Sequence, residues 1–367
     1  MADPAICFAP SSEFALTLGR RVAREFEASH RSRFADWSVW AIAAGYVGAG
    51  ALAYALILRS SPGAAGTIAL AVLGGCCAFM VMATVGHAAA HGALTPRRWL
   101  SDFVLFASFA VIGVSGRLWR DRHVGLHHQL PNLPGTGIDG DGSSLLRLLP
   151  HKRWRPAHAL QRFYAPLLYA LAVPHMAWLE DFQLLAAARR AVPAGYRGWC
   201  VLAEFAGAKL LHLILLIAIP TLLLHPPIWA LLGTYAIAMT VSSTAFLALT
   251  IGTHLSDMAE FPAPNAGGKL AHDWATHQVM TTIDWMPTNA LVTALLAAVN
   301  ADVAHHLFPQ YSHHHAALLS RIIAEEAAAH GVPYRKASFA RVLQGHWRHL
   351  TRLGQPEEIV MSAARRS

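Results

Sequence analysis

The sequence predicts an all-α integral membrane protein in which four transmembrane helices form two hairpins and a helical cytoplasmic cap carries a metal site. Of its 367 residues, 54% are hydrophobic and only 14% are charged, whereas soluble proteins carry about 25% charged residues. The apolar residues gather in four runs that are each long enough to cross a bilayer, which takes roughly 20 residues. Histidines cluster beside the ends of these runs.

The apolar runs come in two closely connected pairs. Residues 37–58 and 64–86 are separated by the segment RSSPG, and residues 199–224 and 228–252 are separated by HPP. Because Gly and Pro interrupt helices, each pair is predicted to be a helical hairpin with a short turn. Three shorter apolar stretches, 103–115, 163–179 and 289–299, are predicted to lie in the membrane interface or to be re-entrant.

Basic residues predict the orientation. Arg59 is the only Lys or Arg in either hairpin turn, so the turns are expected outside and both termini inside the cell. Residues 87–198 and 253–367 then form the cytoplasmic cap of a single unit covering residues 1–367, expected in a bacterial inner membrane. With four spans, every histidine cluster faces the cytoplasm. The formal net charge of +8 is explained by this orientation, and no nucleic-acid-reading motif is present.

The histidine clusters have the spacing of metal ligands. GHAAAHG and HVGLHH each place two imidazoles four residues apart, on one face of a helix. A third cluster lies in DVAHHLFP, and one histidine closes the fourth run. The candidate ligands are His87, His91, His123, His127, His128, His254, His305 and His306.

Imidazole suits Fe, Cu, Ni or Zn. Eight histidines exceed the four ligands of one zinc site and suit two metals with open positions, for which iron with dioxygen is the natural candidate. The alternative is a solvated polar face, which also fits HHH at 313–315. The single histidines on polar segments are expected at the surface: His30, His151, His158, His330, His346 and His349.

Together the motifs HxxxH, HxxLHH and HHLFP, with HLSDMAEFP (254–262), DWATHQVMTTIDW (273–285) and the segment 147–171, resemble the membrane fatty acid desaturase family. The similarity is greatest to its acyl-CoA and front-end acyl-lipid branch. The resemblance implies a non-haem diiron centre, with two Fe ions held by the eight histidines. It implies an enzyme that uses O₂ to introduce a double bond into a fatty acyl chain linked to CoA, a carrier protein or a lipid, or present as the free acid.

The same resemblance leaves several outcomes open. No haem motif of a fused cytochrome b5 is present, so electrons are expected from a separate ferredoxin or cytochrome b5. Hydroxylases, acetylenases and alkene-forming decarboxylases share the motifs and remain alternatives. A metal transporter is a further alternative, but it should place its ligands at mid-bilayer, whereas these clusters lie at the ends of the spans.

Several acidic and basic residues are candidates for supporting roles. Asp302 stands where relatives carry histidine or glutamine, so it is a possible metal ligand, a partner of a ligand imidazole, or a helix N-cap. Asp139 and Asp141 are candidates to hold loops or histidine N–H groups. Lys209 lies inside the third apolar run, where an ionisable group is either functional or extended to the interface.

Overall fold

The computed structural model describes residues 6–60, 62–136, 143–191 and 196–356. The chain forms two compact units, each built from segments that are distant in sequence. The first unit comprises Met1–Arg33, Gly125–Pro166 and Ala248–Ser367, and the second comprises Phe34–Val124 and Leu167–Leu247. The expectation of a single unit over the whole chain stays a prediction.

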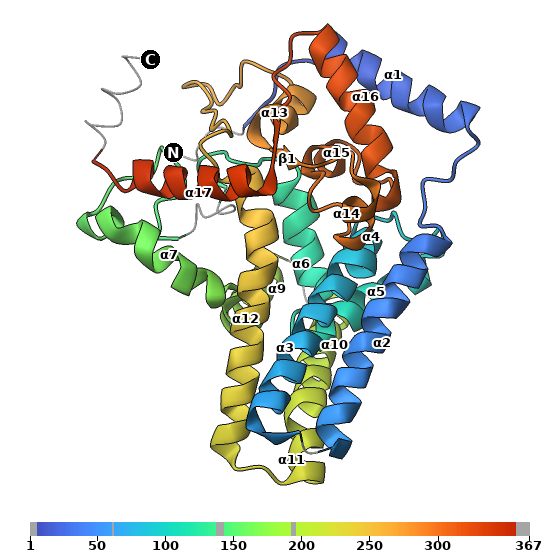
Figure 1. Cartoon of the computed structure of the whole chain (residues 1–367). Helices are drawn as coiled ribbons and strands as arrows, with labels where there is room; N and C mark the ends of the chain where they lie inside the picture. The colour runs from blue at the N-terminus through green and yellow to red at the C-terminus, as the bar shows by residue number, and fades with distance from the viewer. Residues whose placement is uncertain (1–5, 61, 137–142, 192–195, 357–367) are drawn as a thin grey trace. The chain divides into compact units, whose positions relative to one another are not determined.

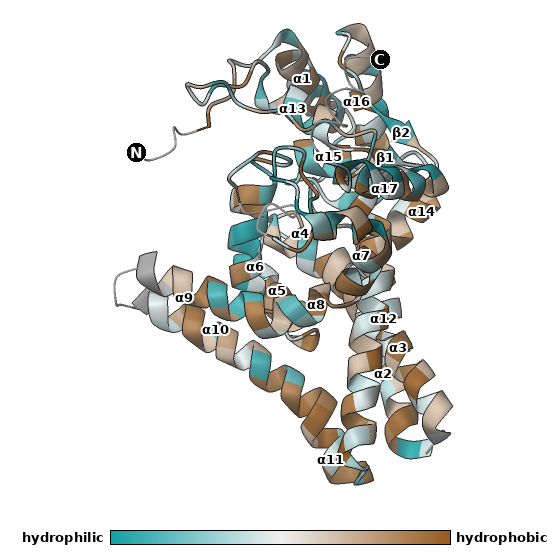
Figure 2. Ribbon diagram, turned by 90° about the vertical axis from the view of Figure 1, so that its left-hand side faces the viewer, coloured by the Kyte–Doolittle hydropathy of each residue, from teal (hydrophilic) through white to brown (hydrophobic). Residues whose placement is uncertain are grey.

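Among the described residues, four helices are long and apolar enough to cross a membrane, as the sequence predicts: Trp37–Ser60, Gly63–Ala90, Gly198–Leu224 and Ile228–His254. In Figure 1 the first two, α2 (Trp37–Ser60) and α3 (Gly63–Val81), run side by side, and Figure 2 shows the apolar character of α11 (Ile219–Leu224). The turn after α11 forms because His225 adopts a left-handed conformation with φ 48° and the two prolines that follow cannot continue the helix.

The remaining helical elements of the second unit lie between the spans or break them. A π-helical turn, η1 (Met82–Gly86), precedes α4 (His87–Ala90), and η5 (Ile214–Ala218) follows α10 (Tyr196–Leu213). The other bounds are α5 (Arg98–Val111), α6 (Gly116–Arg122), α8 (Ala172–His175), η4 (Met176–Glu180) and α9 (Asp181–Ala191). Two further elements, η2 (His123–His127) and the span α12 (Ile228–His254), begin in the second unit and end in the first.

The short apolar stretch at 103–115 is sharply bent. Helices Arg98–Val111 and Gly116–His127 meet at an angle of 103°. The bend is possible because Gly113 has φ +80° and because Ser115 caps the second helix, accepting a hydrogen bond from Leu118 N. Phe109, fully buried beside Val85 and Ile112, anchors the first helix in the apolar core.

The first unit has a helical core and a small strand pair. Its bounds are α1 (Glu13–Ala28), η3 (Pro156–Leu160), α7 (Gln161–Ala170), α13 (Trp274–Thr281), β1 (Asp284–Trp285), α14 (Ala290–Leu295), α15 (Asp302–Leu307), η6 (His313–His315), α16 (Ala316–Ala329), β2 (Lys336–Ala337) and α17 (Phe339–Leu353). Phe14, Leu18 and Val22 on one face of α1 pack against α16, beside which α1 lies in Figure 1. The parallel pair β1–β2 is a small addition to the predicted all-α fold.

Helix α17 covers the segment that follows α12. Asp257 N donates to Gly345 O at 3.1 Å, and His346 Nδ1 donates to Leu255 O at 2.6 Å. The expectation that His346, His349 and His158 lie at the surface is wrong, because all three are buried. Each finds a backbone partner within its own unit, as when His349 Nε2 donates to Leu148 O at 2.7 Å.

Candidate metal centre

Three histidines from separate segments converge in the first unit. His127 ends the π-helical turn η2, His254 ends α12 and His306 lies on α15. Their ligand nitrogens all lie within 4.8 Å of one another, and the Nε2 atoms of His254 and His306 are 3.1 Å apart. Imidazole nitrogens that converge in this way, two of them on buried rings, form a donor set that fits a borderline metal ion such as iron.

Neighbouring polar groups fix the orientation of these rings. His306 Nδ1 lies 2.9 Å from the side-chain Oε1 of Gln278 on α13. A hydrogen bond donated there leaves the Nε2 lone pair of His306 facing the other ligands, which is how metal-binding histidines are usually oriented. Asn132 Nδ2 donates to the carbonyl of His254 at 3.1 Å. Gln278 and Asn132 were missed as functional residues, although Gln278 lies in the 273–285 motif.

A neighbouring histidine supports the same loop. His277 Nε2 lies 2.8 Å from Pro131 O. Burial lowers the pKa of His277 to about 4, and the hydrogen bond to this carbonyl only partly opposes that shift. His277 is therefore a neutral donor at physiological pH and fixes the backbone next to Asn132.

Two more predicted ligands lie beside this group. The rings of His128 and His305 are 4.6 Å apart in an edge-to-face arrangement, and His128 also stacks on His306 at 4.3 Å. The carbonyl of His128 accepts a hydrogen bond from Trp274 Nε1 at 3.2 Å. The first unit thus brings together five of the eight predicted ligands.

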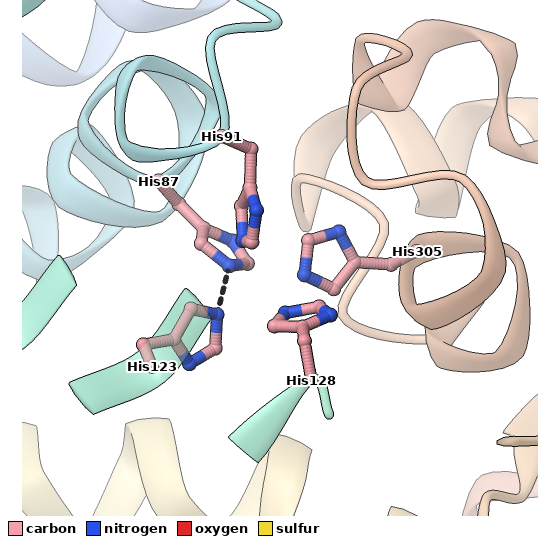
Figure 3. A group of neighbouring side chains, drawn as sticks. All are labelled: His87, His91, His123, His128 and His305. Carbon is pink, nitrogen blue, oxygen red and sulfur yellow. Dashed lines mark hydrogen bonds between the residues drawn. The ribbon is translucent and has the colours of Figure 1, made fainter. Parts of the chain in front are cut away.

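The other three predicted ligands meet in the second unit. His87, His91 and His123 have ring centroids 4.8 to 5.1 Å apart, and the Nε2 atoms of His87 and His123 are 2.8 Å apart. Figure 3 shows these three rings turned toward one another, with that contact dashed. Trp119 stacks on His123 at 4.2 Å and holds the ring in place.

Two of the π-helical turns among the described residues, η1 and η2, occur at candidate ligands. The turn η1 ends at Gly86, immediately before His87, and η2 begins at His123. A π-turn inserts an extra residue into a helix and is found most often at functional sites. Here it adjusts where each histidine side chain projects from its helix.

Asp302 points toward the first-unit histidines. Its Oδ2 lies 3.2 Å from His254 Nε2 and its Oδ1 lies 3.8 Å from His306 Nε2. Burial is the largest single influence and would raise the pKa of Asp302, but the hydrogen bond and charge of His254, together with Thr253 and His127, outweigh it and the pKa is lowered. The carboxylate is therefore ionised beside two candidate ligands.

The helix-cap interpretation of Asp302 is wrong. Helix α15 begins at Asp302, and the residue before it supplies no side-chain cap. Instead Val303 N donates to Oδ1 of Asp284, at 2.9 Å. Burial raises the pKa of Asp284 to about 7, against the effect of a hydrogen bond from Tyr334 Oη at 2.6 Å. Asp284 on β1 therefore caps α15, and the Asp302 carboxylate lies beside the histidines instead. The other two acidic candidates, Asp139 and Asp141, lie outside the described residues.

A second polar cluster lies within the second unit. Lys209 is 7% exposed, and its Nζ donates to Gly113 O and Ala177 O at 2.5 Å and to Asp181 Oδ2 at 2.6 Å. Glu204 accepts a hydrogen bond from the hydroxyl of Ser115. The expectation that Lys209 extends to the interface is wrong, because carbonyl and carboxylate oxygens near the bend between α5 and α6 satisfy its ammonium group.

The histidine geometry and the spans agree with the comparison to known protein families. The model of the fatty acid desaturase family matches residues 62–338. The chain belongs to the fatty acid desaturase family. All eight candidate histidines lie within the matched residues.

Individual desaturases are similar to the chain over most of its length. It is 27% identical to the sn-1 linoleoyl-lipid 6-desaturase of Arthrospira platensis and 28% identical to that of Synechocystis sp., over 68% and 74% of the chain. It is 29% identical to the acyl-lipid (8-3)-desaturase of Mortierella alpina, over 74% of the chain. These alignments cover 67%, 76% and 62% of the relatives, so the chain spans less than two thirds of the Mortierella protein.

Proposed function

We propose that the protein is a membrane acyl-lipid desaturase that uses two iron ions, O₂ and electrons from a separate ferredoxin or cytochrome b5 to introduce a double bond into a fatty acyl chain. The observation that carries the proposal is the convergence of His127, His254 and His306 in a chain of the fatty acid desaturase family. The names of the relatives support a lipid-linked acyl chain over an acyl-CoA, an acyl carrier protein or a free acid.

The proposed ligands divide between the two units. His127, His254 and His306 would hold one ion. His87, His91 and His123 are the core of the donor set for the other, and the resemblance assigns His128 and His305 to the same pair of ions. Iron bound by these residues would supply O₂ activation and removal of hydrogen from an unactivated methylene.

The protein's own contribution is orientation. Gln278 holds the Nε2 of His306 toward the site, and Asn132 fixes the backbone at His254. Trp119 keeps the His123 ring from rotating. Because the methylenes of an acyl chain are chemically alike, the position of the chain relative to the metal selects the carbon that reacts.

Product analysis and iron content test this proposal together. The full chain is expressed in a host whose lipids are profiled by mass spectrometry, and the purified protein is assayed for iron. We expect new unsaturated acyl chains and two irons per chain. In His306→Ala the new acyl chains should be lost and the iron content should fall, whereas His151→Ala, a change at an exposed histidine, should keep the products and the iron. Hydroxylated or shortened products would instead establish one of the alternative reactions, and unchanged iron in His306→Ala would contradict the ligand assignment.

We also propose that Asp302 acts directly on the metal centre, as a ligand or as the acceptor for a ligand imidazole. Asp302→Asn keeps the shape of the side chain but removes its charge, so iron content and turnover should both fall. Asp121→Asn is the matched control, because the Asp121 side chain is 66% exposed. If Asp302→Asn binds two irons with normal affinity, the histidines suffice without it.

The orientation of the chain is part of the proposal. A cysteine introduced at Pro226, in the second hairpin turn, should react with an impermeant thiol reagent added outside intact cells. A cysteine at the exposed Gly135 should react only after the membrane is permeabilised. The reverse pattern would place the histidines on the outer side.

A further inference from the structure

We propose that α7 and α17 together form a binding site for the phosphate headgroup of an anionic phospholipid. The site, here called the α7–α17 patch, consists of Arg162, Phe163, Trp347, Arg348 and Arg352. It lies wholly within the first unit. The proposal does not depend on the reaction proposed above, because lipid binding is measured without turnover.

The patch surrounds a depression on the protein surface. An open cavity of about 440 Å³ is lined by Arg162, Trp347, Arg348, Thr351, Arg352 and Gln355. Three guanidinium groups and one hydroxyl thus border one concavity. Arginine offers a planar fork of donors that matches the oxygens of a phosphate. This is the chemistry expected around a phosphate group.

Among the residues that the structure describes, acidic neighbours do not cancel the charge of the patch. Asp257 lies 3.8 Å from Arg348, but it already accepts two shorter contacts from Arg341, at 3.0 and 3.2 Å. Within the part of the chain that the structure describes, Arg162 and Arg352 make no ion pair, and the buried Nε of Arg162 has no hydrogen-bond acceptor. As far as the described residues show, the site therefore keeps a net positive charge.

Two aromatic rings at the patch distinguish a lipid headgroup from a soluble anion. Phe163 is 59% exposed and Trp347 is 45% exposed, with their ring centroids 6.3 Å apart. The guanidinium carbon of Arg162 sits 4.6 Å from the centre of the Phe163 ring. Tryptophan is enriched at the headgroup level of a bilayer, which is where Trp347 would lie with a headgroup bound at the arginines.

An apolar face continues from the patch along α7. Leu160, the last residue of η3, and Phe163 on α7 lie three residues apart within the first unit and are 61% and 59% exposed. A helix with one bare apolar face beside cationic groups lies in the plane of the membrane surface. A soluble anion would leave this face exposed to water, whereas the acyl chains of a phospholipid would cover it.

The opposite face of α17 contacts the metal-binding segment. His346 binds the carbonyl of Leu255, the residue after His254, while Trp347 and Arg348 face outward. A headgroup bound at the patch thus sits on the helix that fixes His254. The lipid would hold that helix at a defined depth in the interface.

Lipid titration of the purified full-length protein tests the proposal. Dioctanoyl phosphatidylglycerol and dioctanoyl phosphatidylcholine are titrated separately in a neutral detergent, and bound lipid is counted by native mass spectrometry. We expect the wild type to bind phosphatidylglycerol at least tenfold more tightly than phosphatidylcholine. Each arginine at a membrane surface contributes about fivefold, so Arg162→Gln/Arg348→Gln/Arg352→Gln should abolish this preference.

The control replaces three exposed arginines outside the patch, Arg20, Arg24 and Arg31, by Gln. It should bind phosphatidylglycerol within twofold of the wild type. An equal loss in this control would show that binding depends on the net charge of the protein and not on the patch, which would overturn the proposal. A wild type that does not distinguish the two lipids would also overturn it. If the triple variant does not fold, Arg352→Gln alone, at an exposed position, should weaken phosphatidylglycerol binding about fivefold, and unchanged binding refutes the site.

Discussion

Replacing Lys209 with Met should strongly destabilise the second unit. Lys209 Nζ makes three contacts of 2.5 to 2.6 Å, to the carbonyls of Gly113 and Ala177 and to Asp181 Oδ2. The variant removes all three and leaves a fully buried carboxylate whose one remaining donor among the described residues is Ser115 N, at 2.8 Å.

The size of the effect follows from the buried charge. Breaking a buried ion pair by removing one partner costs about 3–5 kcal/mol, and we expect about 4 kcal/mol of unfolding free energy to be lost. Asp181→Asn in the Lys209→Met background removes the orphaned charge while its amide oxygen still accepts from Ser115. The double variant should therefore recover about 2 kcal/mol, because much of the single-variant cost is the unpaired charge.

Reversible unfolding in mixed detergent micelles with increasing sodium dodecyl sulfate, followed by tryptophan fluorescence, measures these differences. Lys336→Met, at an exposed position, is the control and should change stability by less than about 0.5 kcal/mol. A Lys209→Met protein within about 1 kcal/mol of the wild type, or a double variant less stable than Lys209→Met, would refute the reasoning.

Three further predictions concern the first unit. Burial lowers the pKa of His349 to about 3, so the folded state resists protonation and the free energy of unfolding falls as the pH drops below about 6.5. His349→Gln should make that fall shallower by up to about 1.4 kcal/mol per pH unit. The control His151→Gln should leave the pH dependence of stability unchanged. Gly345→Ala places a Cβ 2.7 Å from Asp257 Oδ1 and should cost about 1–3 kcal/mol, measured as a lower unfolding midpoint; an unchanged midpoint would show that α17 shifts freely. Asn132→Ala removes a donor to three backbone carbonyls and should cost about 2–3 kcal/mol and lower iron content; full iron occupancy would contradict its positioning role.

The parts of the fold that depend on local sequence were predictable. The four spans follow from apolar runs that are long enough to cross the bilayer, and the histidine clusters follow from histidines that are adjacent or four residues apart. Such patterns need no knowledge of distant contacts. The ends of the spans differ from prediction by only a few residues, because the helices continue past the apolar runs into the first polar turn.

The errors concern residues whose partners are remote in sequence. His349 is a polar residue on a polar helix, but the carbonyl that its ring binds belongs to Leu148, 201 residues earlier. The sequence around Asp302 is typical of a helix cap, yet the side chain that caps this helix is that of Asp284, on β1. Burial of a polar side chain is decided by such long-range partners, and a single sequence does not display them.

The Lys209 contacts also constrain how the protein is made. A lone lysine at the centre of a spanning helix costs about 2.5–3.5 kcal/mol during insertion by the translocon, and Lys209 lies well inside the span Gly198–Leu224. Its carboxylate partner, Asp181, is synthesised 28 residues earlier. The counter-charge is therefore synthesised before the third span, so the carboxylate that pairs with Lys209 is present in the chain when the cationic helix enters the bilayer.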